Sequence, residues 1–281
     1  MTLPQAAERE PVQVTLRRCG VVFASSGSEL DVEGVLNPGV TRDREGRLVL
    51  YPRLVAAGNV SRIGLAVARE TAHGPVFGTV DVALAPEMPY ERRALGNGYG
   101  CEDPRVTYVA PLDLYVMAYC AYGPRGPRVA LAVSEDAYRW RRLGLVEFAD
   151  ARIDELPNKD GAFFPDVVRS PAGVASLAFY HRPMLRESVN GQAPIGFIES
   201  LRPEQREVTC IAYVPLDAVR RDLDRLRFVS ESVVVLPVGE RWGTLKNGAG
   251  TPPVRTPAGW LSFFHGVDAV ERGTTPSLYY R

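Results

Sequence analysis

The sequence predicts an all-β fold of the β-propeller class, in which four-stranded sheets surround a central channel. Short apolar or alternating runs rich in Val, Tyr and Phe are bounded by Gly, Pro and Asp, and few stretches keep a helical period for three turns. Glycine and proline are abundant, with 26 and 23 residues among 281. Two sequence markers also repeat along the chain, and the first two copies of each are 66 residues apart.

The first marker is an apolar segment at residues 62–70, which recurs at 128–136 and more weakly at 195–200. The second is the motif Pro-x-Val, which begins at Pro38, Pro104 and Pro165 and recurs around Pro253, within the string Thr251-Pro252-Pro253-Val254. An apolar run follows each motif, and we expect strands at 48–55, 114–122, 176–181 and 260–265. Units of this length match a propeller blade better than a solenoid repeat, which is usually shorter and more uniform.

Four units are thus expected to begin near residues 37, 103, 164 and 251, within a single catalytic domain spanning residues 1–281. Two further strands, at 12–16 and 20–24, could complete the last blade and close the ring; the alternative is that the chain lacks a C-terminal piece. Between strands, the charged segment 216–226 predicts a short exposed turn or helix.

Composition excludes several classes of function. The 33 basic and 33 acidic residues cancel, so a basic nucleic-acid-binding face is not expected. The longest apolar runs are too short to span a membrane, and the N-terminus lacks the pattern of a signal peptide, so we expect no membrane partner and a cytoplasmic location. The four cysteines are Cys19, Cys101, Cys120 and Cys210. They are far apart and show no metal-ligand spacing, so we expect reduced, mostly buried thiols, no metal site and no cofactor.

Polar side chains recur where each unit's strands should meet the central channel, which is where function gathers in a propeller. They are Asn37, Arg53, Glu102, Asp103, Asn158, Lys159, Asp160, His181, Arg182, Lys246, Asn247 and His265. Carboxylates can hold hydroxyls or transfer protons, and cations can bind an anion, so the set suits a sugar with a phosphate beside it. The alternative is that Asp and Asn only cap turns and pair with the cations.

Other catalytic motifs are missing from the sequence, which contains no GxSxG elbow, P-loop or HExxH. The glycine-rich segment at 96–100 opens no expected helix. Cys101 has no histidine near it in sequence, and we expect a buried structural thiol rather than a nucleophile.

The string GCEDPRVT at residues 100–107 resembles the EDPR signature of glycoside hydrolase family 130, the β-mannoside phosphorylase family of five-bladed propellers. Further motifs match in the family's order between about residues 35 and 270: Asn37-Pro38, Pro52-Arg53, Arg128 to Asp136 with Trp140, Asn158-Lys159-Asp160, His181-Arg182-Pro183, Lys246 to Pro253 with Trp242, and Gly259 to Leu261 with His265-Gly266. Family members usually continue beyond the position of Arg281 with a last-blade segment carrying another sugar-contacting aspartate.

The resemblance implies an inverting phosphorylase that converts a β-mannoside and inorganic phosphate into α-mannose 1-phosphate. Asp103 would donate the proton, directly or through a sugar hydroxyl, and no second carboxylate is then needed to activate water. Phosphate would be held by Asn158, Lys159, Arg182, Lys246 and His265. The mannoside would be held by Asn37, Arg53, Glu102, Arg128 and His181.

Two rival functions stay open. A hydrolase of the same family would use water in place of phosphate. A catalytically silent propeller would only bind carbohydrate. The cations favour the phosphorylase, because gathering them without an anion would be costly. The expected partners are an oligosaccharide and phosphate, and the sequence leaves open whether copies of the chain form a homo-oligomer.

Overall fold

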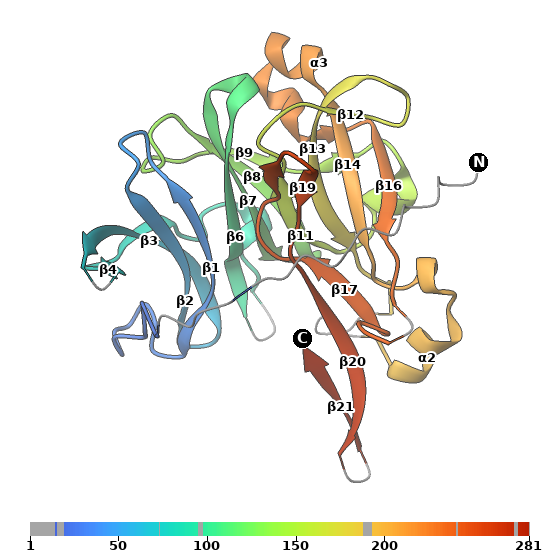
Figure 1. Ribbon diagram of the computed structural model, residues 1–281. Helices are drawn as coiled ribbons and strands as arrows, with labels where there is room; N and C mark the ends of the chain where they lie inside the picture. The colour runs from blue at the N-terminus through green and yellow to red at the C-terminus, as the bar shows by residue number, and fades with distance from the viewer. Residues whose placement is uncertain are drawn as a thin grey trace.

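The computed structural model describes residues 15, 20–72, 74–94, 98–187, 193–239, 241–272 and 275–280, with the backbone alone at 270–272 and 275–277. Most of these residues lie in antiparallel strands, and the helices are short (Figure 1). Three complete four-stranded units and a three-stranded fourth follow one another along the described chain.

In the first unit three strands pair in chain order, β1 (Gly34–Arg42), β2 (Leu48–Ala56) and β3 (Val60–Thr71). Two short strands, β4 (Gly74–Phe77) and β5 (Asp81–Leu84), both pair with β3. The second unit is a simple meander: β6 (Tyr99–Val109), β7 (Leu114–Gly123), β8 (Gly126–Ser134) and β9 (Arg141–Leu145). A short parallel contact between β3 and β6 joins the two units.

The third unit repeats this order: β11 (Asn158–Phe163), β13 (Ala175–Pro183), β14 (Thr209–Pro215) and β16 (Glu231–Leu236), with β12 (Val168–Arg169) beside β13. The fourth consists of β17 (Lys246–Ala249), β20 (Phe264–Arg272) and β21 (Thr275–Tyr280). Between β17 and β20 the chain forms a separate hairpin of β18 (Val254–Thr256) and β19 (Gly259–Leu261).

Short connecting elements complete the architecture. The helices are α1 (Ala151–Asp154), α2 (Ile195–Ser200) and α3 (Leu216–Arg221), and the 3-10 turns are η1 (Pro89–Glu91), η2 (Ala110–Leu112), η3 (Pro203–Gln205) and η4 (Leu223–Arg227). A small parallel pair, β10 (Glu147–Phe148) with β15 (Phe228–Val229), ties the second unit to the third. The predicted turn or helix at 216–226 is confirmed.

The hydrophobic core lies between neighbouring units. Tyr51 and Met117 pack in the cluster shared by the first two units. Phe163 and Phe179 stack 4.7 Å apart in the cluster between the second and third units, which α3 and η4 cover with buried leucine and valine side chains. Because these side chains are fully buried, they fix how one unit sits against the next.

The strands expected at 48–55, 114–122 and 176–181 are confirmed as β2, β7 and β13, each the second strand of its unit. The 62–70 and 128–136 segments likewise occupy β3 and β8, the third strands. The repeat therefore reflects structurally equivalent strands. The three described cysteines are buried and unpaired, as expected for Cys101, Cys120 and Cys210.

Several expectations were wrong. The segment 195–200 is helix α2, because Ile195 and Ile198 lie one helical turn apart and bury one face; the third strand of that unit is β14. The run 260–265 divides into β19 and the start of β20. Residues 20–24 form no strand, and all but one residue of 12–16 lie outside the described residues.

The first strands of the four units, β1, β6, β11 and β17, lie side by side around one region of the molecule (Figure 1). The motif Pro-x-Val was expected to open each unit. Pro38 and Pro104 do lie within first strands, but Pro165 and Pro253 follow β11 and β17, so the third and fourth units begin earlier than expected.

Three of these first strands contain a β-bulge at the corresponding place. In each bulge one residue other than glycine has a positive φ: Asn37 at 37°, Asp103 at 50° and Asp160 at 62°. Such backbone is strained for these residue types, and bulges redirect side chains. The register confirms that the positions are equivalent, since the residue before each bulge pairs with Arg53, Cys120 or Arg182 on the second strand.

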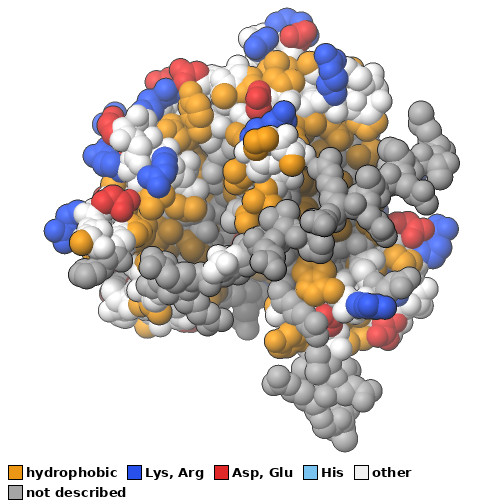
Figure 2. All heavy atoms as spheres, in the orientation of Figure 1, with side chains coloured by type: hydrophobic (Ala, Val, Ile, Leu, Met, Phe, Trp, Pro, Cys, Tyr) orange, Lys and Arg blue, Asp and Glu red, His pale blue; other side chains and the backbone are white. Residues whose placement is uncertain are grey.

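Apolar side chains are visible across the middle of the face shown in Figure 2, and charged side chains lie mainly around its rim. Leu36 and Val40 on β1 are exposed, as are Val254 and Leu261 on the β18–β19 hairpin.

Candidate active site

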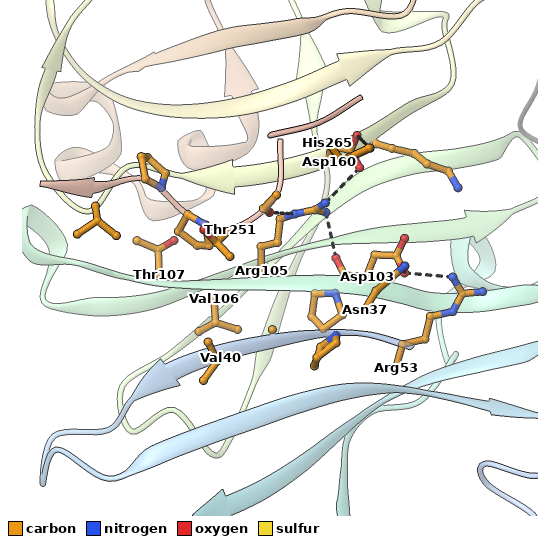
Figure 3. A pocket seen from close by; sticks show the side chains of 18 of the residues that line it. Asn37, Val40, Arg53, Asp103, Arg105, Val106, Thr107, Asp160, Thr251 and His265 are labelled. Atoms are coloured by element: carbon orange, nitrogen blue, oxygen red, sulfur yellow. Dashed lines mark hydrogen bonds and ion pairs between the residues drawn. The ribbon is translucent and has the colours of Figure 1, made fainter. Parts of the chain in front are cut away.

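A cavity of about 1150 Å³ lies among the first strands of the four units. Its wall includes all three bulge residues, and the loop between β17 and β18 and the ends of β13, β20 and β21 complete it (Figure 3). The charged and polar side chains on this wall are Asn37, Arg53, Asp103, Arg105, Thr107, Tyr108, Lys159, Asp160, Arg182, Thr251, His265 and Tyr280.

Asp103, the predicted proton donor, faces this cavity from the bulge in β6. Its Oδ1 accepts hydrogen bonds from Asn37 Nδ2 at 2.9 Å and from Arg53 NH1 at 3.1 Å. Burial raises the pKa of Asp103, but the positive charges of Arg53 and Lys159 outweigh burial and hold that pKa below its ordinary value. These neighbours therefore keep Asp103 ionised at neutral pH.

Arg53 joins two neighbouring carboxylates. Its NH2 group donates to Glu102 Oε1 at 2.9 Å, while its Nε donates to Ser61 Oγ at 3.0 Å. Glu102 does not line the cavity, and burial raises its pKa, in contrast to that of Asp103. The adjacent carboxyl groups consequently have pKa values displaced in opposite directions, an arrangement typical of acid–base sites.

Asp160 is the second carboxylate that faces the cavity. Its Oδ2 accepts from Arg182 Nε at 2.7 Å and lies 4.0 Å from His265 Nε2, and its Oδ1 accepts from Arg105 NH2 at 3.2 Å (Figure 3). Arg105 also donates to the carbonyl oxygens of Ala249 and Gly250, which fixes its guanidinium between β6 and the end of β17. Burial favours a higher pKa for Asp160, but the arginines and His265 hold it far below the ordinary value.

Two further charges lie behind Arg182. Glu207 Oε2 accepts from Arg182 NH1 at 3.3 Å and lies 3.9 Å from Lys246 Nζ. Burial is the main cause that lowers the pKa of Lys246, and repulsion from Arg182 lowers it further. Lys159, by contrast, lines the cavity; burial lowers its pKa, but the neighbouring acidic groups Cys120, Glu102 and Asp103 raise it overall.

The structure thus brings six of the predicted site residues to the cavity wall: Asn37, Arg53, Asp103, Lys159, Arg182 and His265. The other five do not line the cavity and are buried: Glu102, Arg128, Asn158, His181 and Lys246.

His181 shows why some of these residues are not at the cavity. Its ring is fully buried, with Nδ1 beside the Asn158 side chain and Nε2 2.8 Å from Ser232 Oγ. Burial lowers the pKa of His181 to about 3, so the ring is neutral and cannot attract an anion. The register also places Arg182, rather than His181, at the position equivalent to Arg53. Arg128, which is also buried, contacts Asp154 at 3.6 Å.

The sequence argument that the cations need an external anion is weakened. The cluster contains five cations, Arg53, Arg105, Lys159, Arg182 and Lys246, but four carboxylates lie among them: Glu102, Asp103, Asp160 and Glu207. Protein groups therefore already neutralise most of the positive charge, and what remains for a ligand is a small excess held in a fixed geometry.

Sequence reasoning did not select Arg105 or Glu207, and it placed Asp160 in the polar set at the channel without assigning it a role. Arg105 and Asp160 stand within the quoted strings EDPR and NKD, and their recurrence beside the candidates was the available signal. Glu207 follows a loop between helix α2 and strand β14, and its proximity to Arg182 comes only from the tertiary fold.

Within the described ranges, no group of three or more His, Cys, Asp and Glu side chains could hold a metal ion. Over the same part of the chain, no helix is sufficiently long and apolar to cross a membrane.

A family model described as beta-1,4-mannooligosaccharide phosphorylase matches residues 8–188, more than half of the chain. Two curated proteins of Thermoanaerobacter sp. (strain X514) are also similar. A 1,2-beta-oligomannan phosphorylase is 26% identical over 219 residues, covering 74% of this chain and 54% of the relative. A beta-1,2-mannobiose phosphorylase is 26% identical over 212 residues, covering 74% and 53%. The chain therefore spans about half the length of these curated relatives.

Among solved structures, a beta-1,2-mannobiose phosphorylase from Listeria innocua, in complex with beta-1,2-mannobiose, superimposes with a TM-score of 0.58 at 17% identity, covering 87% of this chain and 74% of that one. A putative glycoside hydrolase from Bacteroides ovatus gives a TM-score of 0.55 at 19% identity, with 88% and 67% covered. At this identity the likeness concerns the fold, and it confirms the prediction of an all-β, five-bladed propeller fold.

Proposed function

Since the chain belongs to glycoside hydrolase family 130, we propose that it is an inverting phosphorylase that cleaves β-mannosides with inorganic phosphate. The products would be α-mannose 1-phosphate and an acceptor shortened by one mannose. The observation that supports this proposal is that the carboxylate of Asp103, the cations of Lys159 and Arg182 and the imidazole of His265 line the same cavity.

The proposed reaction breaks the bond between the anomeric carbon and the glycosidic oxygen. Asp103 supplies a proton to the departing oxygen, directly or through a sugar hydroxyl, while an oxygen of hydrogen phosphate bonds to the anomeric carbon from the opposite face. This attack inverts the β-linkage to the α-configuration. The proton that hydrogen phosphate carries is left over after attack and returns to Asp103, so the cycle balances without a cofactor.

The lowered pKa of Asp103 is compatible with this cycle. Arg53 and Lys159 hold the carboxylate ionised, and an anion bound among the cations would offset their field. Phosphate binding would then raise the pKa of Asp103 and favour its protonated, acid form. The site would become competent for proton donation only when its second substrate is present.

The substrate linkage is a separate question, because the family description refers to β-1,4-mannooligosaccharides and the similar curated proteins to β-1,2-linked ones. We would incubate the protein with β-1,4- and β-1,2-mannobiose, with and without inorganic phosphate, and assay mannose 1-phosphate and free mannose. Mannose 1-phosphate formed only with phosphate supports the proposal and identifies the linkage.

A hydrolase is the second candidate, and the pairing of the cations with Asp160 and Glu207 is the observation that favours it. Another solved structure, titled as a study of family 130 hydrolases acting on beta-1,2 mannosidic linkages in Candida mannan, has a TM-score of 0.53 at 20% identity, with 88% of this chain and 65% of that one covered. Free mannose released equally with and without phosphate would replace the phosphorylase by this hydrolase. Binding of mannobiose without either product would indicate a carbohydrate-binding propeller.

A further inference from the structure

The proposed reaction assigns a role to Asp103 but none to Asp160, although both face the cavity from equivalent bulges. An inverting phosphorylase needs only one protein carboxylate, because phosphate replaces the activated water of a hydrolase. The second carboxylate must therefore have a different role, or none.

The surroundings of Asp160 make it unsuited to proton transfer. Both of its oxygens accept hydrogen bonds from guanidinium groups, and only 6% of the residue is exposed. The arginines and His265 keep its pKa far below the ordinary value. A carboxylate in this state stays ionised and holds no proton to give.

The same contacts make Asp160 a common anchor for two guanidinium groups and one imidazole, which come from different units. Burial lowers the pKa of that imidazole, His265, so it is a neutral hydrogen-bonding group. Arg105 lies on β6, Arg182 on β13 and His265 on β20. Arg182 is held between Asp160 and Glu207, and Arg105 between Asp160 and two carbonyl oxygens of the fourth unit. Asp160 is thus an acceptor shared by both guanidinium groups and helps to set their donor directions, and the strained backbone at φ 62° places its side chain there.

The packing around Asp160 and His265 leaves no room for an added methyl group. Gly248 on β17 pairs with His265, and a Cβ atom at Gly248 would lie 2.2 Å from Asp160 Oδ2 and 2.6 Å from the nearest ring carbon of His265. Any larger side chain must displace the carboxylate, the imidazole or both. Glycine at this position is therefore what allows Asp160 and His265 to approach each other.

We propose that Asp160 is a positioning residue that aligns Arg105, Arg182 and His265 to receive the phosphate group consumed in the reaction. This inference rests on the proposed phosphorylase function. It predicts that the anion site depends on the direction of the donors as well as on their total charge. Removing the carboxylate makes the site more positive, yet phosphate should bind less well because the guanidinium groups lose their fixed orientation.

The test is Asp160→Asn, which keeps the shape of the side chain but removes its charge and one acceptor. We expect the KM for inorganic phosphate to rise by about tenfold or more, since hydrogen bonds to charged groups are among the strong ones. The KM for the β-mannoside should change by less than about twofold, because Asp103, Asn37 and Arg53 keep their contacts. Calorimetric titration with inorganic phosphate alone should show the same loss of affinity.

The matched control is Asp43→Asn. Asp43 is also 6% exposed and also accepts a hydrogen bond from an arginine, Arg47, but it lies in the turn between β1 and β2 and does not line the cavity. This variant reports what a buried Asp–Arg pair is worth to stability, and its phosphate KM should equal that of the wild type. A second test variant, Gly248→Ala, displaces Asp160 and His265 without changing any charge, and it should also raise the phosphate KM.

The outcomes separate the two proposals. Suppose that the wild type forms mannose 1-phosphate and that the phosphate KM of Asp160→Asn and Gly248→Ala stays within about threefold of the wild-type KM. This result overturns the positioning role and leaves the phosphorylase proposal intact. A wild-type protein that releases mannose without phosphate and binds no phosphate overturns both. If Asp160→Asn does not fold, the phosphate affinity of Gly248→Ala decides.

Discussion

Asn37 and Asp103 lie 66 residues apart, the spacing of the sequence repeat, and their side chains are joined by a hydrogen bond of 2.9 Å from Asn37 Nδ2 to Asp103 Oδ1. Both have a positive φ and both occupy a bulge in the first strand of their unit. The repeat has therefore given two neighbouring units the same strained position with different residues. One residue is a neutral amide and the other a carboxylate, and their contact orients the carboxylate toward the cavity.

The first prediction concerns the acid. Asp103→Asn should lower kcat by about 10²- to 10⁴-fold, because the departing oxygen loses its proton source. The affinity for β-mannobiose, measured calorimetrically, should stay within about threefold, since the amide keeps the shape of the side chain. The Asp43→Asn variant is the control for a generic Asp-to-Asn effect. Unchanged turnover in Asp103→Asn would show that another group donates the proton.

Arg53 gives a prediction about pH. Arg53→Gln removes the positive charge that holds down the pKa of Asp103, so that pKa should rise and the alkaline limb of the kcat profile should move to higher pH. Arg53→Lys keeps the charge but cannot bridge Glu102, Asp103 and Ser61 at once, so kcat should fall by about tenfold with a smaller movement of the limb. The comparison requires full pH profiles of both variants. If the alkaline limb lies at the same pH in both variants, the charge of Arg53 does not determine the pKa of Asp103.

Much of the fold could be predicted, because its signals are local. Second and third strands of the units carry continuous apolar runs that must be buried, and these strands were placed correctly in the first two units. The first strands were harder to place. β11 and β17 are only six and four residues long, and the bulge in β11 breaks its alternation, so the sequence predicts units starting near Pro165 and Pro253 rather than at Asn158 and Lys246.

The site residues also divide into those that a local sequence pattern predicts and those that it does not. Residues next to a bulge were found from the sequence because they stand in recurring polar strings, as Asp103 and Lys159 do. His181 was chosen from its place beside Arg182, but neighbouring residues on a strand point to opposite faces, so only one of the two can reach the cavity. Contacts such as Arg182 with Glu207 depend on tertiary packing, which no local pattern encodes.

A third prediction concerns stability, and it compares two carboxylates that bind one arginine. Glu91 is fully buried, and its Oε1 accepts from Tyr119 at 2.6 Å and from Arg142 at 2.9 Å; Glu87, with 62% of its side chain exposed, contacts the same arginine at 3.0 Å. Glu91→Ala should lower the free energy of unfolding by about 3 kcal/mol, because it leaves buried partners unpaired. Glu87→Ala should cost less than about 0.5 kcal/mol, as exposed pairs do. Urea denaturation of both variants checks this, and equal losses would contradict it.

The last prediction uses His181, whose buried ring has a pKa lowered to about 3 from the ordinary 6.5. Between these values the unfolded chain binds a proton at this position and the folded chain does not, so acidification favours unfolding. The wild type should lose about 2 kcal/mol of stability through this residue between pH 7.5 and pH 5, and His181→Gln should not show that part of the loss. Urea denaturation at the two pH values measures the difference. Because the ring does not line the cavity, His181→Gln should also leave the KM for the β-mannoside within about twofold, whereas a large rise would return His181 to the substrate site.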